Sequence, residues 1–316
     1  MNEFDLIKTV FAPLAGEGSF GLTDDIAVTG AQVVSKDLLV AGVHFRREDP
    51  LDLVAQKALR TNISDIIAKG CQPAGYLLGL VWPREMGHAD AQLFAEGLRR
   101  DQDLYGCTLL GGDTTRHEMA GAPLMISVTM MGTPLGAGPV LRTGAQPGDV
   151  LMVSGVIGDG WLGLQALTRG DHGNGAIDYY QCPTLSFGLQ ELVARVGTAA
   201  LDVSDGLIAD AEHLARQSGV GIEIDAAAVP LSDEGRAHVA ANGEAGLVDL
   251  LTGGDDYQIL FSVSPALAQN TVSEAGLHGL SVTAIGHCVD TDVGRVHVSG
   301  RSGRLPDIRK TGYRHF

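Results

Sequence analysis

Nine aspartates that stand beside glycine, serine or the end of an apolar run place the strongest constraint on the fold. They are Asp24, Asp25, Asp37, Asp65, Asp113, Asp202, Asp205, Asp255 and Asp256. A carboxylate set among Val, Ile, Leu and Gly is partly desolvated on folding, which is unfavourable unless a cation pairs with it. The chain has 38 acidic and only 22 basic residues, so protein cations are scarce. We therefore expect a hard divalent metal ion, best Mg²⁺, which takes oxygen ligands and often bridges to phosphates.

The overall composition limits the number of domains and the kinds of partner. A chain of 316 residues is long enough for about two average domains. Its net charge of −16 argues against nucleic acid or an anionic membrane as a partner. A phosphorylated ligand stays compatible with this charge, because bound metal ions reverse its local sign. No apolar run approaches the roughly 18 residues of a membrane span.

The start of the chain and its cysteines indicate a cytoplasmic protein. The first residues lack the basic region and the long apolar region of a signal peptide. The four cysteines are scattered and form no Cys-x-x-Cys pair. We expect reduced thiols and no zinc site.

Strand-like runs accompany two helical segments in the first half of the chain. The runs cover residues 31–35, 75–81, 108–110 and 124–131. The first helix is predicted to take Asp49 as its N-cap and Pro50 as its first residue, and to end at Gly70. The second is predicted over residues 88–105. In the first helix the 3–4 spacing of apolar residues predicts that Asp65 lies on or beside the buried face.

A cluster of glycine and proline at residues 132–148 is the best candidate for a linker. After it, strand-like runs cover residues 150–154, 200–203, 221–224, 259–263 and 282–285. A further helix follows Ser204. Because strands alternate with helices in both halves, we predict an α/β (α+β) protein with domains at residues 1–140 and 141–316.

Gly111, Gly112 and Asp113 directly follow a strand-like run. Glycine at such a place lets the backbone approach a phosphate closely, and the aspartate can hold the accompanying metal ion. An ordinary turn from a strand into a loop is the alternative explanation. The other acidic turns of the chain favour the phosphate interpretation.

Gly158, Gly160 and Gly163 match the Gly-x-Gly-x-x-Gly fingerprint of dinucleotide-binding proteins. The match lacks its usual continuation, a second strand that ends in Asp or Glu about 20 residues later. A helix N-terminus that contacts a phosphate, or simply a tight turn, explains these glycines better. A nicotinamide-dependent oxidoreductase that uses this turn remains an alternative.

Other phosphate-binding and nucleophile motifs are missing or ambiguous. A Walker A loop is excluded, because the chain contains no Gly-Lys dipeptide and only five lysines. If the protein binds ATP, metal ions and arginines must neutralise the phosphates. Arg116 and Arg142 lie in suitable regions, and both also fit solvated loops. His44 lies in an apolar stretch, where a lone histidine is usually structural. No Gly-x-Ser-x-Gly nucleophile elbow is present.

Taken in order, these motifs resemble the thiamine-monophosphate kinase family, which belongs to the superfamily of aminoimidazole-ribonucleotide synthetase. The resemblance covers nearly the whole chain and rests on residues 24–25, 37–45, 57–66, 111–116, 142–149, 202–207, 253–257 and 312–316. Four positions depart from the family pattern, in which glycine, a hydroxyl residue, arginine and glutamate are common; they are Thr23, Lys36, Thr184 and Gln258. None of these departures removes a metal carboxylate.

The resemblance implies ATP-dependent phosphorylation of thiamine monophosphate to thiamine diphosphate, the last step of thiamine diphosphate biosynthesis, with several Mg²⁺ ions. The catalytic residues that it implies are Asp37, Asp65, Asp113 and Asp205. The implied metal ligands are Asp25, Asp37, Asp65, Asp113, Asp202 and Asp205, with hydroxyl or backbone oxygen from Ser35 and Lys36. The implied contacts to ATP are Gly112, Asp113, Arg142 and Ser204, and those to thiamine monophosphate are His44, Asp255 and Tyr313.

The resemblance also implies an architecture and a reaction type. The N-terminal domain would bind ATP and Mg²⁺ and form a homodimer through its sheet, and the C-terminal domain would cover the nucleotide. Donor and acceptor are both phosphates, and an acceptor phosphate oxygen is already ionised at neutral pH. Catalysis then needs positioning and charge neutralisation instead of a general base or a covalent intermediate. That agrees with a chain rich in aspartates and poor in candidate nucleophiles.

Other functions remain open beside this one. A selenophosphate synthetase would be expected to carry a reactive cysteine near its start, whereas the first cysteine here is Cys71. A hydrogenase-maturation relative would be expected to end in a cysteine-containing tail, whereas this chain ends in His315 and Phe316. A non-catalytic nucleotide sensor would bind ATP without transferring its phosphate, and the retained aspartates weigh against it.

Overall fold

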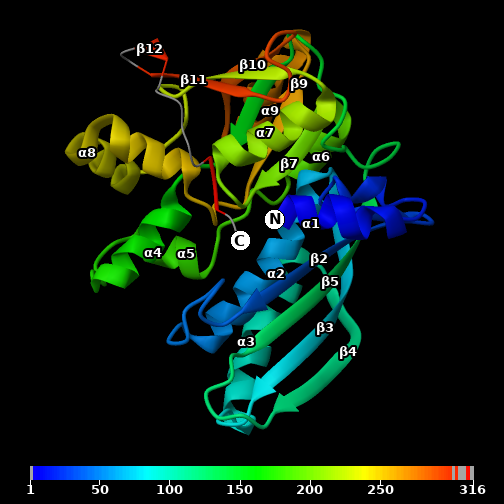
Figure 1. The fold of residues 1–316 in the computed structure, drawn as a ribbon, viewed down its shortest axis with the longest axis vertical. Coiled ribbons are helices and arrows are strands. Elements are labelled where there is room, and N and C mark those ends of the chain that lie inside the picture. The colour runs from blue at the N-terminus through cyan, green and yellow to red at the C-terminus, as the bar shows by residue number, and fades with distance from the viewer. Residues whose placement is uncertain (1–2, 301–302, 305–310, 314–316) are drawn as a thin grey trace.

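The computed structural model describes residues 3–300, 303–304 and 311–313. Each half of the chain builds one sheet with helices packed against it (Figure 1). The strand order is β1-β2-β5-β3-β4 in the N-terminal sheet and β12-β11-β8-β10-β6-β9-β7 in the C-terminal sheet. The predicted α/β architecture with two domains is confirmed.

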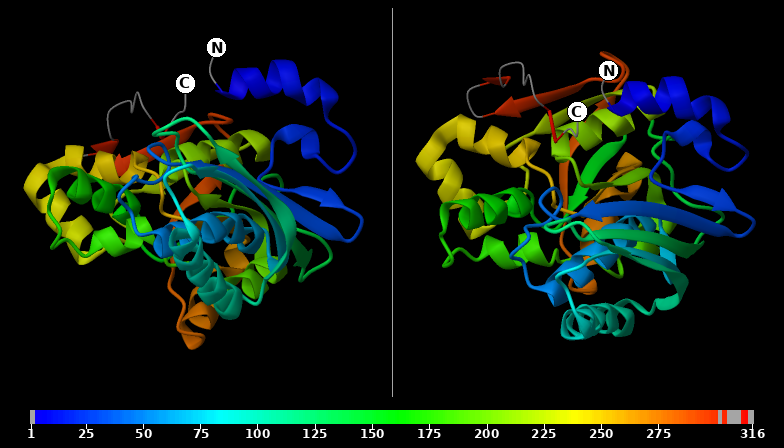
Figure 2. Two further views of the ribbon diagram at one scale, coloured as in Figure 1. Left: turned by 90° about the horizontal axis from the view of Figure 1, so that it is seen from below. Right: turned by 60° about the horizontal axis from the view of Figure 1, so that its bottom comes forward.

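The N-terminal sheet is mainly antiparallel, and β4 joins it in parallel to β3. Its strands are β1 (Ala27–Thr29), β2 (Gln32–Val40), β3 (Cys71–Pro83), β4 (Thr108–His117) and β5 (Met125–Pro134). Helices α2 (Leu51–Ala68) and α3 (His88–Tyr105) lie together on one side of this sheet (Figure 2). Four short helices precede the first strand of this sheet along the chain: α1 (Glu3–Leu6), η1 (Ile7–Phe11), η2 (Ala12–Leu14) and η3 (Phe20–Leu22).

The C-terminal sheet is antiparallel except where β11 pairs with β8. Its strands are β6 (Val150–Ser154), β7 (Gly197–Val203), β8 (Gly221–Asp225), β9 (Gln258–Val263), β10 (Val282–Val289), β11 (Val296–Gly300) and β12 (Gly303–Arg304). The helices of this half are α4 (Asp159–Arg169), α5 (Ala176–Gln181), α6 (Leu189–Val196), α7 (Leu207–Ser218), α8 (Asp233–Thr252) and α9 (Pro265–Leu277).

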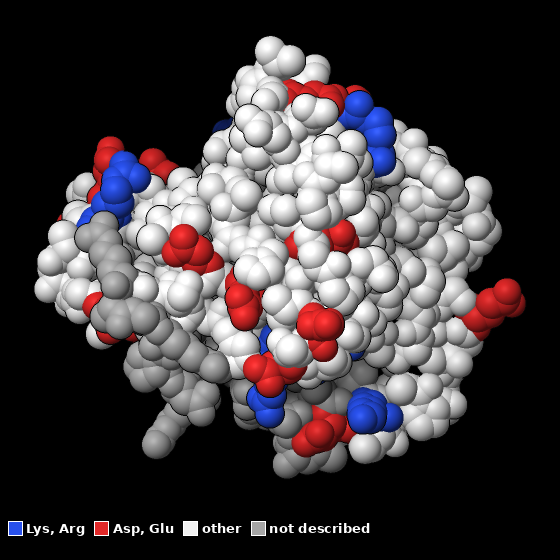
Figure 3. Space-filling view, turned by 90° about the horizontal axis from the view of Figure 1, so that it is seen from above, with Lys and Arg blue, Asp and Glu red and all other residues white. Residues whose placement is uncertain are grey.

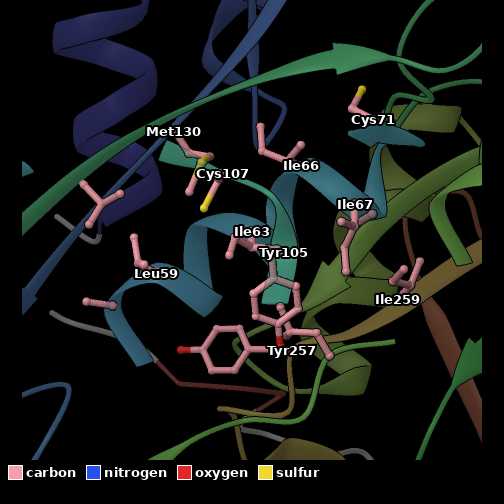
Figure 4. Packing of buried hydrophobic residues seen from close by; sticks show 14 of the residues in the cluster. Leu59, Ile63, Ile66, Ile67, Cys71, Tyr105, Cys107, Met130, Tyr257 and Ile259 are labelled. Carbon is pink, nitrogen blue, oxygen red and sulfur yellow. The ribbon is translucent and has the colours of Figure 1, made fainter. Parts of the chain in front are cut away.

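Helix α2 is the central element of the molecule and is buried on nearly all sides. The N-terminal sheet covers one side of it, and β7 and β9 of the C-terminal half pack against another. Figure 4 shows its side chains Leu59, Ile63, Ile66 and Ile67 packed with residues of the surrounding strands and of α3. Burial of apolar surface, at about 25 cal/mol per Å², holds the helix between the two halves. Asp65 is thereby fixed beside the buried face of α2, as the spacing predicted, and the structure adds that this face lies where the halves meet.

The start of α2 lies one residue later than predicted. The helix begins at Leu51, and Pro50 stays outside it with a ψ of 130°. Asp49 does not cap the helix; its carboxylate accepts hydrogen bonds from the backbone N–H of Arg46 and from the side chain of Gln181. These two contacts hold the carboxylate away from the first turn.

Strand β4 is longer than the sequence pattern predicted. It continues to His117, so Gly111, Gly112 and Asp113 lie inside the strand and not in a turn after it. The prediction of a strand end at residue 110 is therefore wrong. Parallel pairing with β3, which sets Asp113 opposite Gly79, supplies backbone partners that the local sequence does not reveal.

The surface reflects the acidic composition. On the face seen in Figure 3, acidic side chains are spread between uncharged ones, and the few basic side chains lie close to acidic neighbours. Among the residues described, no helix combines the length and the apolar character needed to cross a membrane.

Candidate active site

A cleft of about 950 Å³ opens where the two halves meet. The N-terminal half contributes the segment before β1, strand β2 and helix α2 to its walls, and the C-terminal half contributes α7. Residues 311–313 return to the same place and complete the lining. Segments that are far apart in the sequence therefore share one cavity.

Three carboxylates converge at this junction. One oxygen each of Asp25, Asp65 and Asp202 lies within 4.8 Å of the others. Asp25 precedes β1, Asp65 is on the last turns of α2, and Asp202 is near the end of β7. Asp37 of β2 lines the same cleft, and its backbone N–H donates to the amide oxygen of Asn62 on α2 at 3.2 Å. Ser35 donates its hydroxyl hydrogen to Asp65.

The pKa values within this cluster move in opposite directions. Burial and then the charge of neighbouring aspartates raise the pKa of Asp65 well above its usual value, and they raise the pKa of Asp202 to about 7. Burial acts in the same direction on Asp25, but Arg142 and Lys69 outweigh it and lower its pKa to about 2. The cluster thus holds more negative charge than its protein surroundings neutralise, and it favours a cation.

Two protein cations meet the carboxylates from one side. The ammonium of Lys69 lies 2.9 Å from Asp24 and 2.6 Å from Asp25. The guanidinium of Arg142 pairs with the other oxygen of Asp25, and the backbone N–H of Arg142 donates to Asp24 at 2.7 Å. The role of Lys69 is absent from the sequence prediction.

The residues present fit a hard divalent cation. The donors are carboxylate oxygens without nitrogen or sulfur, which suits Mg²⁺ and related ions. The Oδ2 atom of Asp25 is buried, and its one partner among the residues described is the ammonium of Lys69 at 2.6 Å. A buried acceptor of this kind has capacity for a further ligand.

The turn between β7 and α7 is organised by a residue that sequence reasoning missed. One carboxylate oxygen of Asp210 accepts hydrogen bonds from the backbone N–H groups of Ser204, Asp205 and Gly206 at 3.0–3.2 Å. Asp210 is buried in the first turn of α7. An acidic residue on the apolar face of a helix start was the available signal for this role. The arrangement fixes Ser204 and Asp205 at the cleft.

The structure brings most of the predicted site residues together. The cleft is lined by Asp25, Lys36, Asp37, Asp65, Arg142, Ser204, Asp205 and Tyr313. Asp202 belongs to the carboxylate cluster, and Ser35 contacts it through Asp65. The backbone N–H of Tyr313 donates to the backbone carbonyl oxygen of Asp205 at 3.0 Å, which ties the segment 311–313 to the turn before α7.

Gly112 and Asp113 do not line the cleft of their own chain. Both lie on β4, the edge strand of the N-terminal sheet, where almost every residue is exposed. A Cβ atom at Gly112 would lie 1.8 Å from the carbonyl oxygen of Leu78, so packing against β3 already requires glycine there. Gly112 and Asp113 therefore cannot make their predicted contacts to ATP and metal in this cleft as the chain stands alone.

His44 and Asp255 also lie outside the lining of the cleft. The Nδ1 atom of His44 accepts a hydrogen bond from the backbone N–H of Val40 at 3.0 Å. Asp255 pairs with the buried Lys57 at 2.8 Å and accepts from the hydroxyl of Tyr257 at 2.8 Å. Its backbone φ is 70°, an uncommon value for a residue other than glycine.

The glycine-rich turn at residues 158–163 binds a protein carboxylate. The backbone N–H groups of Gly158 and Gly160 both donate to Asp256, at 2.9 and 3.4 Å. Asp256 is fully buried, and burial raises its pKa well above the usual value. The helix N-terminus that the sequence suggested as a phosphate site is therefore used internally, which removes the support for a dinucleotide at this turn.

Comparison with family models shows the class of protein to which the chain belongs. Residues 23–133 match the family model of the AIR synthase related protein N-terminal domain, and residues 146–299 match that of the C-terminal domain. The chain therefore consists of the two AIR synthase related domains, and its two-domain fold agrees with this class.

Similarity to individual proteins identifies the family within this class. The chain is 40% identical to a thiamine-monophosphate kinase of Caulobacter vibrioides, over 95% of this chain and 88% of the relative. It is 33% identical to that of Escherichia coli (strain K12), over 100% and 98%. A solved structure of AaThiL complexed with AMPPCP and TMP superposes with a TM-score of 0.85 at 30% identity, covering 100% of this chain and 97% of that one. The chain belongs to the thiamine-monophosphate kinase family.

Proposed function

We propose that this kinase transfers the γ-phosphoryl group of ATP to thiamine monophosphate and so completes thiamine diphosphate synthesis. The observation that carries the proposal is the convergence of Asp25, Asp65 and Asp202 at the cleft between the two halves. The names of the relatives and the two ligands in the AaThiL complex support it.

In this proposal Asp25, Asp65 and Asp202 hold Mg²⁺, with Asp37 and Asp205 beside them on the cleft wall. When bound, Mg²⁺ offsets the charge of the two phosphates that must approach each other. The aspartates act as ligands and accept no proton from the substrate, because the acceptor phosphate oxygen is already ionised. We propose that several ions bind in this way.

Arg142 is the residue best placed to meet the nucleotide. Its side chain lines the cleft, and its buried Nε atom has no acceptor among the residues described. A phosphate oxygen would satisfy that donor. We assign Ser204 to the same ligand, because Asp210 holds the turn that presents it. Tyr313 at the cleft and, more distantly, His44 and Asp255 remain our candidates for contact with thiamine monophosphate.

We further propose that the chain works as a homodimer paired through the N-terminal sheet. Helices α2 and α3 cover one face, whereas the opposite face carries the exposed apolar side chains Leu38 (55%) and Leu77 (43%). The pairing register places Asp113 on the same open face. Lys36 extends from this face into the cleft lining, so a partner on it would bring Asp113 and Gly112 close to a cleft. The domain boundary at residue 140 also remains our proposal.

The test is product formation from ATP, Mg²⁺ and thiamine monophosphate, with free thiamine and no acceptor as the two controls. We expect thiamine diphosphate and ADP in equal amounts, and only when thiamine monophosphate is present. Binding of ATP without transfer to the monophosphate would refute the proposal and favour a nucleotide sensor. Transfer to free thiamine alone would assign a different acceptor to the same site.

A further inference from the structure

Lys69 is a completely buried cation at the C-terminal end of α2. Its ammonium lies 2.9 Å from Asp24, 2.6 Å from Asp25 and 2.6 Å from the carbonyl oxygen of Ala200. Three oxygens thus surround the ammonium, and they come from the segment before β1 and from β7. Such a set of contacts leaves the side chain no alternative position and no contact with solvent.

The second cation at the cluster is held less tightly. Arg142 also pairs with Asp25, but its side chain is 18% exposed and borders the cleft. Its Nε atom lacks an acceptor among the residues described, whereas the ammonium of Lys69 is enclosed by oxygens of Asp24, Asp25 and Ala200. Arg142 therefore keeps a donor for a ligand at the cleft, whereas Lys69 is buried among protein oxygens.

We infer that Lys69 is a permanent counter-ion of the acidic cluster, which stabilises the metal-free protein and weakens the binding of the divalent cation. Two buried carboxylates beside each other are unfavourable without a cation, so Lys69 lets Asp24 and Asp25 fold into place before any metal arrives. The same fixed charge repels a divalent ion at Asp25. The inference rests on the proposed metal site and adds to it a residue that sets the affinity.

Lys57 provides a matched control on the same helix. It is equally buried, and it pairs with Asp255 at 2.8 Å while donating to the carbonyl oxygen of Tyr180 at 2.9 Å. Asp255 does not belong to the carboxylate cluster. Loss of Lys57 therefore removes a buried lysine from an ion pair, with an aspartate that is 27% exposed, without changing the charge next to Asp25.

The experiment measures the thermal unfolding midpoint Tm in EDTA and then in increasing Mg²⁺ for the wild type, Lys69→Met and Lys57→Met. In EDTA we expect Lys69→Met to lose roughly 10 °C, because it leaves the buried carboxylates of Asp24 and Asp25 without this cation, and Lys57→Met to lose less, because Asp255 is partly exposed. The Mg²⁺ concentration that gives half of the Tm increase is expected to fall about tenfold in Lys69→Met. It is expected to stay at the wild-type value in Lys57→Met. An unchanged or higher concentration in Lys69→Met would overturn the inference.

The double variant Asp24→Asn/Lys69→Met separates charge from structure. It removes one negative and one positive charge together, so we expect the Mg²⁺ midpoint to return close to that of the wild type. If Lys69→Met alone does not fold, the double variant is compared with Asp24→Asn, and the same tenfold decrease is expected on loss of Lys69; no decrease would refute the inference. A wild-type protein whose Tm ignores Mg²⁺ would refute the metal site and the role of Lys69 together. A wild type that responds, with Lys69→Met at the same midpoint, would refute only the role of Lys69.

Discussion

At the scale of the single residue, the surroundings of Asp65 disfavour its ionised form. Burial and the charges of Asp202, Asp37 and Asp25 raise its pKa, so its ionised form is less stable in the folded protein than in the unfolded chain. We predict that Asp65→Asn raises the unfolding free energy in EDTA at pH 8 by about 1 to 3 kcal/mol. It is expected to lower kcat at least about 100-fold, because it removes a ligand of the proposed metal site. Denaturant unfolding and steady-state kinetics test both changes, and a destabilised variant would contradict the argument.

His213 makes the stability of the protein depend on pH. Burial and then the charges of Arg142 and Arg216 lower its pKa to about 3, whereas the unfolded chain takes up this proton near pH 6.5. Stability is therefore lost as the pH falls below 6.5. We predict that His213→Gln removes this loss, so its unfolding free energy gains about 2 kcal/mol relative to the wild type between pH 7 and pH 5. A difference that does not change over this interval would show that His213 does not titrate in this way.

Single residues also show where sequence reasoning stops. The aspartates of the cluster were predictable, because a carboxylate among apolar residues needs a cation wherever it lies. Lys69 was not, because nothing in the local pattern of residues 66–70 tells that its ammonium meets Asp24 and Asp25 across the fold. Gln258 and Thr184, two departures from the family pattern, prove to be neighbours: the amide of Gln258 donates to the carbonyl oxygen of Thr184 at 3.0 Å.

At the scale of the element, the turn between β7 and α7 depends on Asp210. One carboxylate oxygen serves three backbone N–H groups, and removal of the acceptor leaves buried donors unpaired. We predict that Asp210→Ala lowers the unfolding free energy by about 2 to 4 kcal/mol and raises the KM for ATP. Asp210→Asn keeps an acceptor oxygen and is expected to lose less than half as much. Equal losses in the two variants, measured by urea unfolding, would argue against this role of the hydrogen bonds.

Some helices and strands could be predicted from the sequence, and others could not. Residues 150–154 were predicted as a strand, and β6 has these bounds, because a short buried apolar run between turn residues has few alternatives. The sequence prediction ended strand β4 before Gly111 and Gly112, because glycine usually weakens a strand. Here β3 pairs with it and requires glycine at position 112. Long-range pairing of this kind has no local signature.

At the scale of the whole molecule, the homodimer that we propose pairs through the open face of the N-terminal sheet. A charge placed in an apolar contact is strongly unfavourable, so we predict that Leu77→Glu converts the homodimer to monomers at micromolar concentration. Leu277→Glu is the control, because Leu277 is 85% exposed on α9 of the other half, and this variant is expected to remain dimeric. Sedimentation velocity distinguishes the species. Two dimeric variants, or a monomeric wild type, would contradict pairing through this face.

The proposed homodimer also predicts how Asp113 acts. In its own chain Asp113 lies away from the cleft, so a catalytic role requires the partner's cleft. We predict that Asp65→Asn and Asp113→Asn are each inactive as homodimers, and that equal amounts mixed under conditions of subunit exchange recover about a quarter of wild-type activity. The fraction follows because half of the dimers are then mixed, and each mixed dimer has one site with both aspartates intact. If Asp113 acted within its own chain, every site would lack one aspartate and mixing would recover nothing.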